Sequence, residues 1–160
     1  MKAAAIILIV LVLAAVGGVL YLYINTGLDV NFVSCIATDA VPQAELFNTL
    51  KSKVASSTFV GTRFSAEEIG AADQYQFLTY TVKLNNHAFL NADVIEIRIT
   101  PMSGDVYQIG EEMLHSLSSG KSMDLSATIL TSREVHSVRE ATVSWYFWGI
   151  PFTTKLTLGK

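Results

Sequence analysis

The feature that most constrains this chain is an uncharged run near its N-terminus, "AAAIILIVLVLAAVGGVLYLY" from Ala3 to Tyr23. A helix needs about 20 apolar residues to cross a bilayer, and this run has that length. A helix also satisfies its backbone hydrogen bonds internally, as a segment in lipid must. Tyr21 and Tyr23 lie where the aromatic residues of a membrane interface are found. The run therefore predicts a transmembrane helix in residues 1–24.

A cleavable signal peptide is the alternative interpretation of the same run. Signal peptides have a shorter apolar region, of roughly 7–15 residues, followed by small residues at the cleavage site. The sequence Asn25-Thr26-Gly27 fits such a site poorly, so we expect an uncleaved signal-anchor. Lys2 marks the short side as cytoplasmic by the positive-inside rule. We therefore expect a single-pass protein of the cell membrane, with residues 25–160 as one domain outside the cytoplasm.

Beyond the anchor, apolar and polar residues mostly alternate. Alternation is typical of antiparallel strands that have one face packed and one face in water. Seven strands of this kind predict a mainly-β protein with a β-sandwich. The expected strands are Leu28–Ala37, Thr58–Phe64, Gln76–Leu84, Asp93–Thr100, Met123–Leu130, Ala141–Phe147 and Phe152–Leu158.

One amphipathic helix is expected between the first two strands, within "DAVPQAELFNTLKSKVASS". Asp39 is the expected N-cap and Pro42 is expected in the first turn, where a missing N–H is tolerated. A shorter turn is expected at Ser65, which with Glu68 fits a capping box. The helical stripe that would pack on a sheet consists of Leu46, Phe47, Leu50 and Val54.

The stretch "WYFWGIPF", from Trp145 to Phe152, is interpreted chiefly as the last hairpin. Trp145 and Phe147 share the inward parity of Val143, so we predict that Trp145 is a core residue and that Trp148 is the more exposed tryptophan. The chain is expected to reverse at Gly149-Ile150-Pro151. The outward residues form a candidate contact surface for a partner: Tyr146, Trp148 and Ile150.

The sequence contains few residues in patterns that bind metal ions. The histidines are His87, His115 and His136, without a pair at ligand spacing. Glu112 and His115 have the spacing of a di-iron carboxylate motif, but such sites need two copies in a helical core. The acidic residues Asp105, Glu111 and Glu112 lack the pattern of a calcium loop. We predict no metal site and no cofactor.

Catalysis and nucleic-acid binding are also disfavoured. The chain contains no nucleophile elbow, phosphate-binding loop or dinucleotide fingerprint, so no enzyme and no catalytic residues are predicted. Eleven basic residues against 14 acidic ones give a net charge of −3, which argues against nucleic acid. Cys35 is the single cysteine, so it forms no internal disulfide, and we interpret it as a half-buried strand thiol rather than a lipidated residue.

Two further stretches carry a resemblance, "YTVKLNNHAFLNADVIEIRI" and "LSSGKSMDLSATIL". With Asn85-Asn86 ending one strand and Gly120-Lys121-Ser122 preceding another, the region Leu78–Leu158 resembles membrane-anchored proteins with late-embryogenesis-abundant (LEA14/WHy-type) or FxLYD-type domains. It departs from them in lacking Asn-Pro at the turn and in placing the Pro42 helix early. The resemblance implies an immunoglobulin-like sandwich and a binding or protective module at the cell envelope, without catalytic residues.

Three function classes follow from these observations. The leading one is an anchored, extracytoplasmic interaction module, such as an accessory subunit or an envelope stress-protection protein. Its partners would be the lipid bilayer, through the N-terminal helix, and a protein or a second copy of the chain. The alternative is a subunit of a pilin-like filament, which polymers in electron micrographs would favour. An enzyme comes third, and a polar pocket with convergent histidines and carboxylates would favour it.

Overall fold

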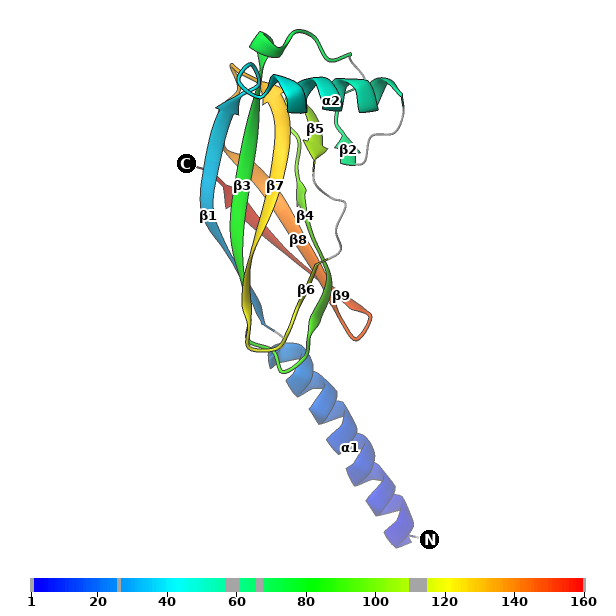
Figure 1. The fold of residues 1–160 in the computed structure, drawn as a ribbon. Helices are drawn as coiled ribbons and strands as arrows, with labels where there is room; N and C mark the ends of the chain where they lie inside the picture. The colour runs from blue at the N-terminus through cyan, green and yellow to red at the C-terminus, as the bar shows by residue number, and fades with distance from the viewer. Residues whose placement is uncertain (1, 26, 57–60, 66–67, 110–114, 160) are drawn as a thin grey trace.

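A computed structural model describes residues 2–25, 27–56, 61–65, 68–109 and 115–159. In these residues the chain is mainly β, with two antiparallel sheets, a long N-terminal helix α1 (Lys2–Asn25) and one other α-helix, α2 (Ala44–Ala55) (Figure 1). The expected mainly-β class and the continuous apolar helix are confirmed. Helix α1 is long and apolar enough from Ala3 to Tyr21 to cross a membrane, a test that a signal sequence also passes.

The two sheets contain nine strands in the described part of the chain. The first sheet has the order β1-β3-β7-β5-β2, and the second has the order β6-β4-β8-β9. The strands of the first sheet are β1 (Leu28–Asp39), β2 (Gly61–Arg63), β3 (Tyr75–Asn86), β5 (Asp105–Ile109) and β7 (Ser122–Ser132). Those of the second are β4 (Ala92–Ile99), β6 (His115–Leu117), β8 (Arg139–Phe147) and β9 (Ile150–Leu158). We call the two packed sheets together the β domain.

The core of the β domain lies between the sheets. Alternate residues of β3 and β7 face alternate residues of β4 and β8, as the sequence pattern predicts. Phe152 joins the core from β9, where its ring is stacked on Trp145 at 6.1 Å and meets Phe147 edge-on at 5.6 Å. The buried members from the four central strands are Leu78, Tyr80, Val82, Leu84, Leu125, Ala127, Ile129, Ala92, Ile95, Ile97, Ile99, Ala141, Val143, Trp145 and Phe147.

Strands β5 and β6 are absent from the sequence prediction. The first four residues of β5 are all buried: Asp105 and Gln108 bind residues of the opposite sheet, and Val106 and Tyr107 pack in one cluster with helix α2. A strand covered on both faces shows no alternation of apolar and polar residues, so alternation does not predict it. Strand β6 has only three residues, too few to show a period.

Gln108 of β5 joins the two sheets. Its buried side chain donates from Nε2 to the carbonyl of Ile97, at 2.7 Å, and accepts at Oε1 from the N–H of Ile99, at 2.8 Å. The amide group therefore pairs with the edge of β4 as a neighbouring strand would, beyond the point where the short strand β6 ends.

Helix α2 covers the outer face of the first sheet, at the end of the β domain farthest from α1 (Figure 1). Its buried residues Phe47 and Leu50 pack with Phe77, Val106 and Leu130 in a second core. The stripe was predicted correctly except at its edge: Val54 is half-buried and Leu46 is 46% exposed.

The expected start of α2 is wrong. Asp39 is the last residue of β1, where it pairs with Gln76 and forms an ion pair with Arg133, so the strand continues through it. Pro42 lies in the turn before the helix, and Gln43 occupies the N-cap position without a side-chain hydrogen bond. The capping box of Ser65 and Glu68 and the start of the Thr58–Phe64 strand include residues outside the described ranges.

Candidate interaction surface

The candidate surface lies at the end of the β domain that receives the chain from α1, which we call the base (Figure 1). Gly27 is fixed there, because its carbonyl accepts a hydrogen bond of 3.0 Å from the N–H of His87. The hairpin of β8 and β9 ends at the same place, since Asp93 at the start of β4 is paired with Tyr146. The base therefore consists of residues 87–91 between β3 and β4, 118–121 between β6 and β7, and the turn Trp148-Gly149.

Asn86 organises the base from inside. Its side chain is buried, donates from Nδ2 to the carbonyls of Leu90 and Leu117, at 2.8 and 2.9 Å, and accepts at Oδ1 from the N–H of Ala88, at 3.0 Å. One amide group thus binds both base connections, because residues 88–90 belong to one and Leu117 leads into the other. A buried amide with three partners fixes the conformation of the loops that it bridges.

A second set of contacts holds the same two connections together. The main chain of Asn86 is hydrogen-bonded to residues 120 and 121, at 2.9 Å each. Ser119 donates from Oγ to the carbonyl of Ala88, at 2.7 Å, and its N–H donates to Oδ1 of Asn91, at 3.1 Å. The base is therefore a rigid support for any side chain that projects from it.

The β8–β9 hairpin reverses through two residues, Trp148 and Gly149, since Phe147 is paired with Ile150. Both central residues have positive φ, +51° and +77°, which matches a type I′ turn. The expected reversal at Gly149-Ile150-Pro151 is therefore wrong, and Pro151 lies inside β9. An edge strand tolerates proline because the missing N–H would point away from the sheet.

Trp148 has a strained backbone conformation, and its side chain is nevertheless largely exposed to solvent. Type I′ turns favour Asn, Asp or Gly, whereas a bulky residue with positive φ is an outlier that costs on the order of 1–3 kcal/mol. The Trp148 side chain is 74% exposed, while Trp145 is 5% exposed. The predicted difference between the two tryptophans is confirmed. Among the described residues of the β domain, no hydrogen bond, ion pair or ring contact of Trp148 explains the choice of Trp for this turn.

The other two predicted contact residues flank this turn. Ile150 is 53% exposed and lies on the side of the hairpin that Phe147 occupies, because cross-strand partners share a face. Tyr146 is 38% exposed and lies on the opposite side. The three residues Tyr146, Trp148 and Ile150 therefore surround the tip of the hairpin rather than covering one sheet face.

Two residues that the sequence reasoning missed extend this surface. Val94 has φ +51° and lies in a bulge where β4 shifts register against β8, so its side chain is 36% exposed. Phe89 projects from the β3–β4 connection and is 58% exposed. The available signal was a large apolar residue inside a polar turn, "NNHAFLN". We call Phe89, Val94, Tyr146, Trp148 and Ile150 the base patch.

Comparison with known proteins gives no relative from which a role can be carried over. No protein-family model matches the chain, and no curated protein does.

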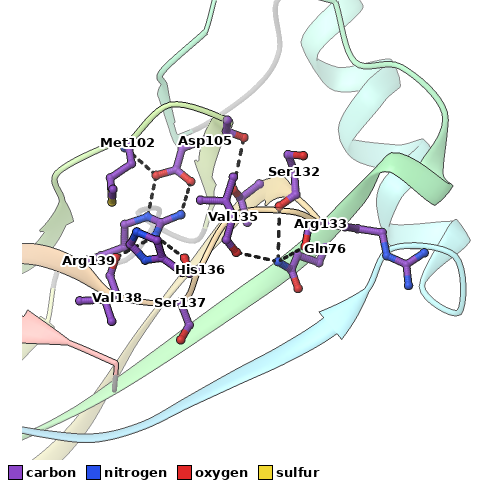
Figure 2. A network of polar contacts seen from close by, with 12 residues as sticks. Gln76, Met102, Asp105, Ser132, Arg133, Val135, His136, Ser137, Val138 and Arg139 are labelled. Carbon is purple, nitrogen blue, oxygen red and sulfur yellow. Dashed lines mark hydrogen bonds and ion pairs between the residues drawn. The ribbon is translucent and has the colours of Figure 1, made fainter.

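The far end of the β domain carries a buried polar network (Figure 2). Arg139 is bonded to the carboxylate of Asp105 and donates from Nη1 to the carbonyls of His136 and Val138, at 2.6 and 2.8 Å. Burial alone would lower the pKa of Arg139, but the hydrogen bonds and charge of Asp105 outweigh burial and raise it. Asp105 also accepts from the N–H of Met102. With these partners the pair holds the β7–β8 connection in place.

Tyr80 and Cys35 lie near this network. The Tyr80 hydroxyl donates to the carbonyl of Ser137, at 2.7 Å, and burial raises its pKa, an effect that the charge of Arg139 offsets only in part. Burial also raises the pKa of the Cys35 thiol, which is half-buried in β1 as predicted. A raised pKa leaves less thiolate at neutral pH, so Cys35 is a weak nucleophile.

The three histidines occupy different places. His87 is exposed, with Nε2 3.0 Å from Oδ2 of Asp29, whereas His115 begins β6 and His136 contributes its carbonyl to Arg139. Within the described ranges no group of three or more His, Cys, Asp or Glu side chains is placed to hold a metal ion. Glu111 and Glu112 lie outside those ranges.

Proposed function

We propose that this chain is a non-catalytic, membrane-anchored interaction module, with α1 as an uncleaved anchor and the β domain outside the cytoplasm. The observation that carries the proposal is Trp148: a large aromatic side chain that is 74% exposed on a turn whose backbone disfavours it. Strained positions concentrate at functional sites, and exposed aromatic anchors dominate binding energetics. The base patch is the contact surface of the module.

The strand order supports an immunoglobulin-like sandwich as the scaffold of this module. In that fold one sheet has the order A-B-E-D and the other contains C-F-G. Here β1-β3-β7-β5 corresponds to the first order and β4-β8-β9 to the second. The connection differs, because the chain visits β5 in the first sheet before β6 in the second. Such sandwiches present their contact residues on the loops at one end, as the base does.

The polar groups of the β domain support a binding role rather than catalysis. Arg139 and Asp105 are fully buried and paired with each other. Asn86 uses its amide to bind main-chain groups of the base. These groups stabilise the two ends of the domain, and the base patch itself is apolar.

Membrane fractionation and site-specific cross-linking test this proposal. The protein should stay with membranes after carbonate extraction, retain an N-terminus before Tyr23, and expose a C-terminal tag to protease added outside the cell. A photo-reactive amino acid at position 148 should give a defined adduct, whereas the same group at the exposed Thr153 of β9 should not. Release by carbonate, or equal adducts from both positions, would contradict the proposal.

A further inference from the structure

We propose that the base patch docks into the interfacial layer of the bilayer that α1 spans, so that the β domain lies on the membrane in one fixed orientation. The inference rests on the proposed anchoring by α1 and names the partner of the contact surface. Trp148 and Phe89 would be the deepest residues, because they are the most exposed members of the patch, at 74% and 58%.

The first argument is the short distance between the span and the base. The apolar span ends at Tyr21, α1 continues to Asn25, and Gly27 is already bonded to His87 of the base. Four helical rises of about 1.5 Å and two residues of at most about 3.6 Å place Gly27 within about 13 Å of Tyr21. The headgroup layer is roughly 5–8 Å thick on each side of the hydrocarbon. Gly27 therefore lies no more than about 8 Å beyond the headgroup layer, so the side chains that project from the base are held close to the membrane surface.

The second argument is the chemistry of the patch. Tryptophan and tyrosine are enriched at membrane interfaces, since their rings enter the apolar boundary while the N–H or O–H group stays hydrated. Trp148 and Tyr146 meet this description, and Phe89, Val94 and Ile150 add apolar surface beside them. Because the patch is uncharged, its insertion needs no anionic lipid.

The third argument is shape. Trp148 projects from the tip of a two-residue hairpin and Phe89 from a separate connection, so the patch is a set of protrusions rather than a groove or a flat sheet face. A protein partner would have to offer a matching pocket for each of these separate side chains, whereas a fluid lipid surface accepts protrusions of any outline. Figure 1 shows α1 leaving the base inclined toward the side that carries this hairpin. Geometry therefore favours lipid over a protein partner.

Tryptophan fluorescence of the full chain in phosphatidylcholine vesicles tests the inference. The chain has two tryptophans, and Trp145 is buried in the core, so a quencher outside the core reports on Trp148. Lipids brominated on their acyl chains should remove most of the Trp148 emission, and iodide in the water should remove little of it. Trp148→Phe should abolish the quenching by brominated lipid, because only Trp145 then emits.

A matched control moves the indole to the far end of the β domain. The double variant Trp148→Phe/Leu46→Trp places it on α2, at a position that is 46% exposed in the natural chain. There the emission should be quenched by iodide and untouched by brominated lipid. This result shows that quenching by lipid requires the base and not merely exposure.

Two outcomes overturn the inference. One is quenching of Trp148 by iodide without quenching by brominated lipid, which would mean that the base stands in water. The other is protection of the Trp148 emission from both quenchers, together with oligomers in cross-linking. That result would mean that the base patch contacts a second copy of the chain instead of lipid. If carbonate releases the protein, anchoring itself fails; if the protein stays in the membrane and iodide quenches Trp148, only the docking fails.

Discussion

Arg139 binds Asp105 through two parallel hydrogen bonds, at 2.8 Å from Nε and 2.7 Å from Nη2, and neither side chain is exposed to water. The pair joins β5 of one sheet to β8 of the other. Removing one partner of a buried ion pair leaves the other charge uncompensated, which costs about 3–5 kcal/mol. We therefore expect Asp105→Ala to lower the free energy of unfolding by about that amount, measured with urea on the full chain in neutral detergent.

The control for this prediction is a second ion pair in the same protein. Asp39 and Arg133 are also 2.8 Å apart, but both side chains are about half exposed. Exposed pairs contribute about 0–1 kcal/mol, so Asp39→Ala should change the free energy of unfolding little. Equal losses in the two variants would show that the contribution of the Arg139–Asp105 pair to the free energy of unfolding does not depend on its burial.

Asn86 gives a second stability prediction, at the opposite end of the β domain. Asn86→Ala leaves the carbonyls of Leu90 and Leu117 and the N–H of Ala88 without their partner. A buried group left unsatisfied costs about 1–3 kcal/mol, so the loss should be at least about 2 kcal/mol. Hydrogen exchange should also speed up in residues 87–91. Asn85→Ala, which removes an exposed contact with Ser122, is the neighbouring control and should do neither.

Tyr80 predicts a dependence of stability on alkaline pH. Burial raises the pKa of its hydroxyl above the ordinary value of about 10, so the unfolded chain loses this proton first. The contribution to stability is complete below pH 10 and is lost as the pH rises beyond it. In a Cys35→Ala background, which removes a neighbouring thiol whose pKa burial also raises, the protein should lose stability above pH 10 more steeply than its Tyr80→Phe variant. Parallel curves would contradict the assignment.

Much of the fold follows from alternation. Where one face of a strand packs and the other meets water, as at Leu78, Tyr80 and Val82 of β3, burial repeats every second residue and the sequence shows it. The same rule fails for β5, because α2 covers the face that would otherwise carry polar residues. The start of α2 is misplaced for a different reason: the N-cap preference of Asp39 is overridden by its pairing with Gln76 in β1.

The candidate surface follows from the sequence only in part. The alternation of inward and outward residues correctly predicts that Trp145 is buried and Trp148 exposed, because β8 is regular up to Phe147. It does not place the turn, because proline is a turn residue in general but is also accepted on an edge strand, where Pro151 lies. The connection that carries Phe89 is held by Asn86, which also binds Leu117, 31 residues further along the chain. Contacts of that range leave no local pattern.

Trp145 gives the largest expected effect of a single side chain in the core. It is stacked on Phe152 and is 5% exposed. Truncating a buried aromatic residue typically costs about 3–5 kcal/mol, so Trp145→Ala should unfold or severely weaken the β domain. Thermal unfolding followed by circular dichroism measures this, and a loss below about 1 kcal/mol would show that the site tolerates the cavity.

Trp148 should behave in the opposite way. Its positive φ is strained for a bulky residue, whereas Asn is favoured at this position of a type I′ turn. Trp148→Asn should therefore keep or raise the stability of the β domain, by about 1 kcal/mol, while removing the largest side chain of the base patch. The same variant should weaken contact with the membrane, seen as faster protease cleavage of the base in vesicles than in the unaltered protein. A gain in stability together with a loss of contact is the signature of a residue retained for function rather than for folding. A loss of stability comparable to that of Trp145→Ala would instead make Trp148 a structural residue, and the base patch would lose its strongest support.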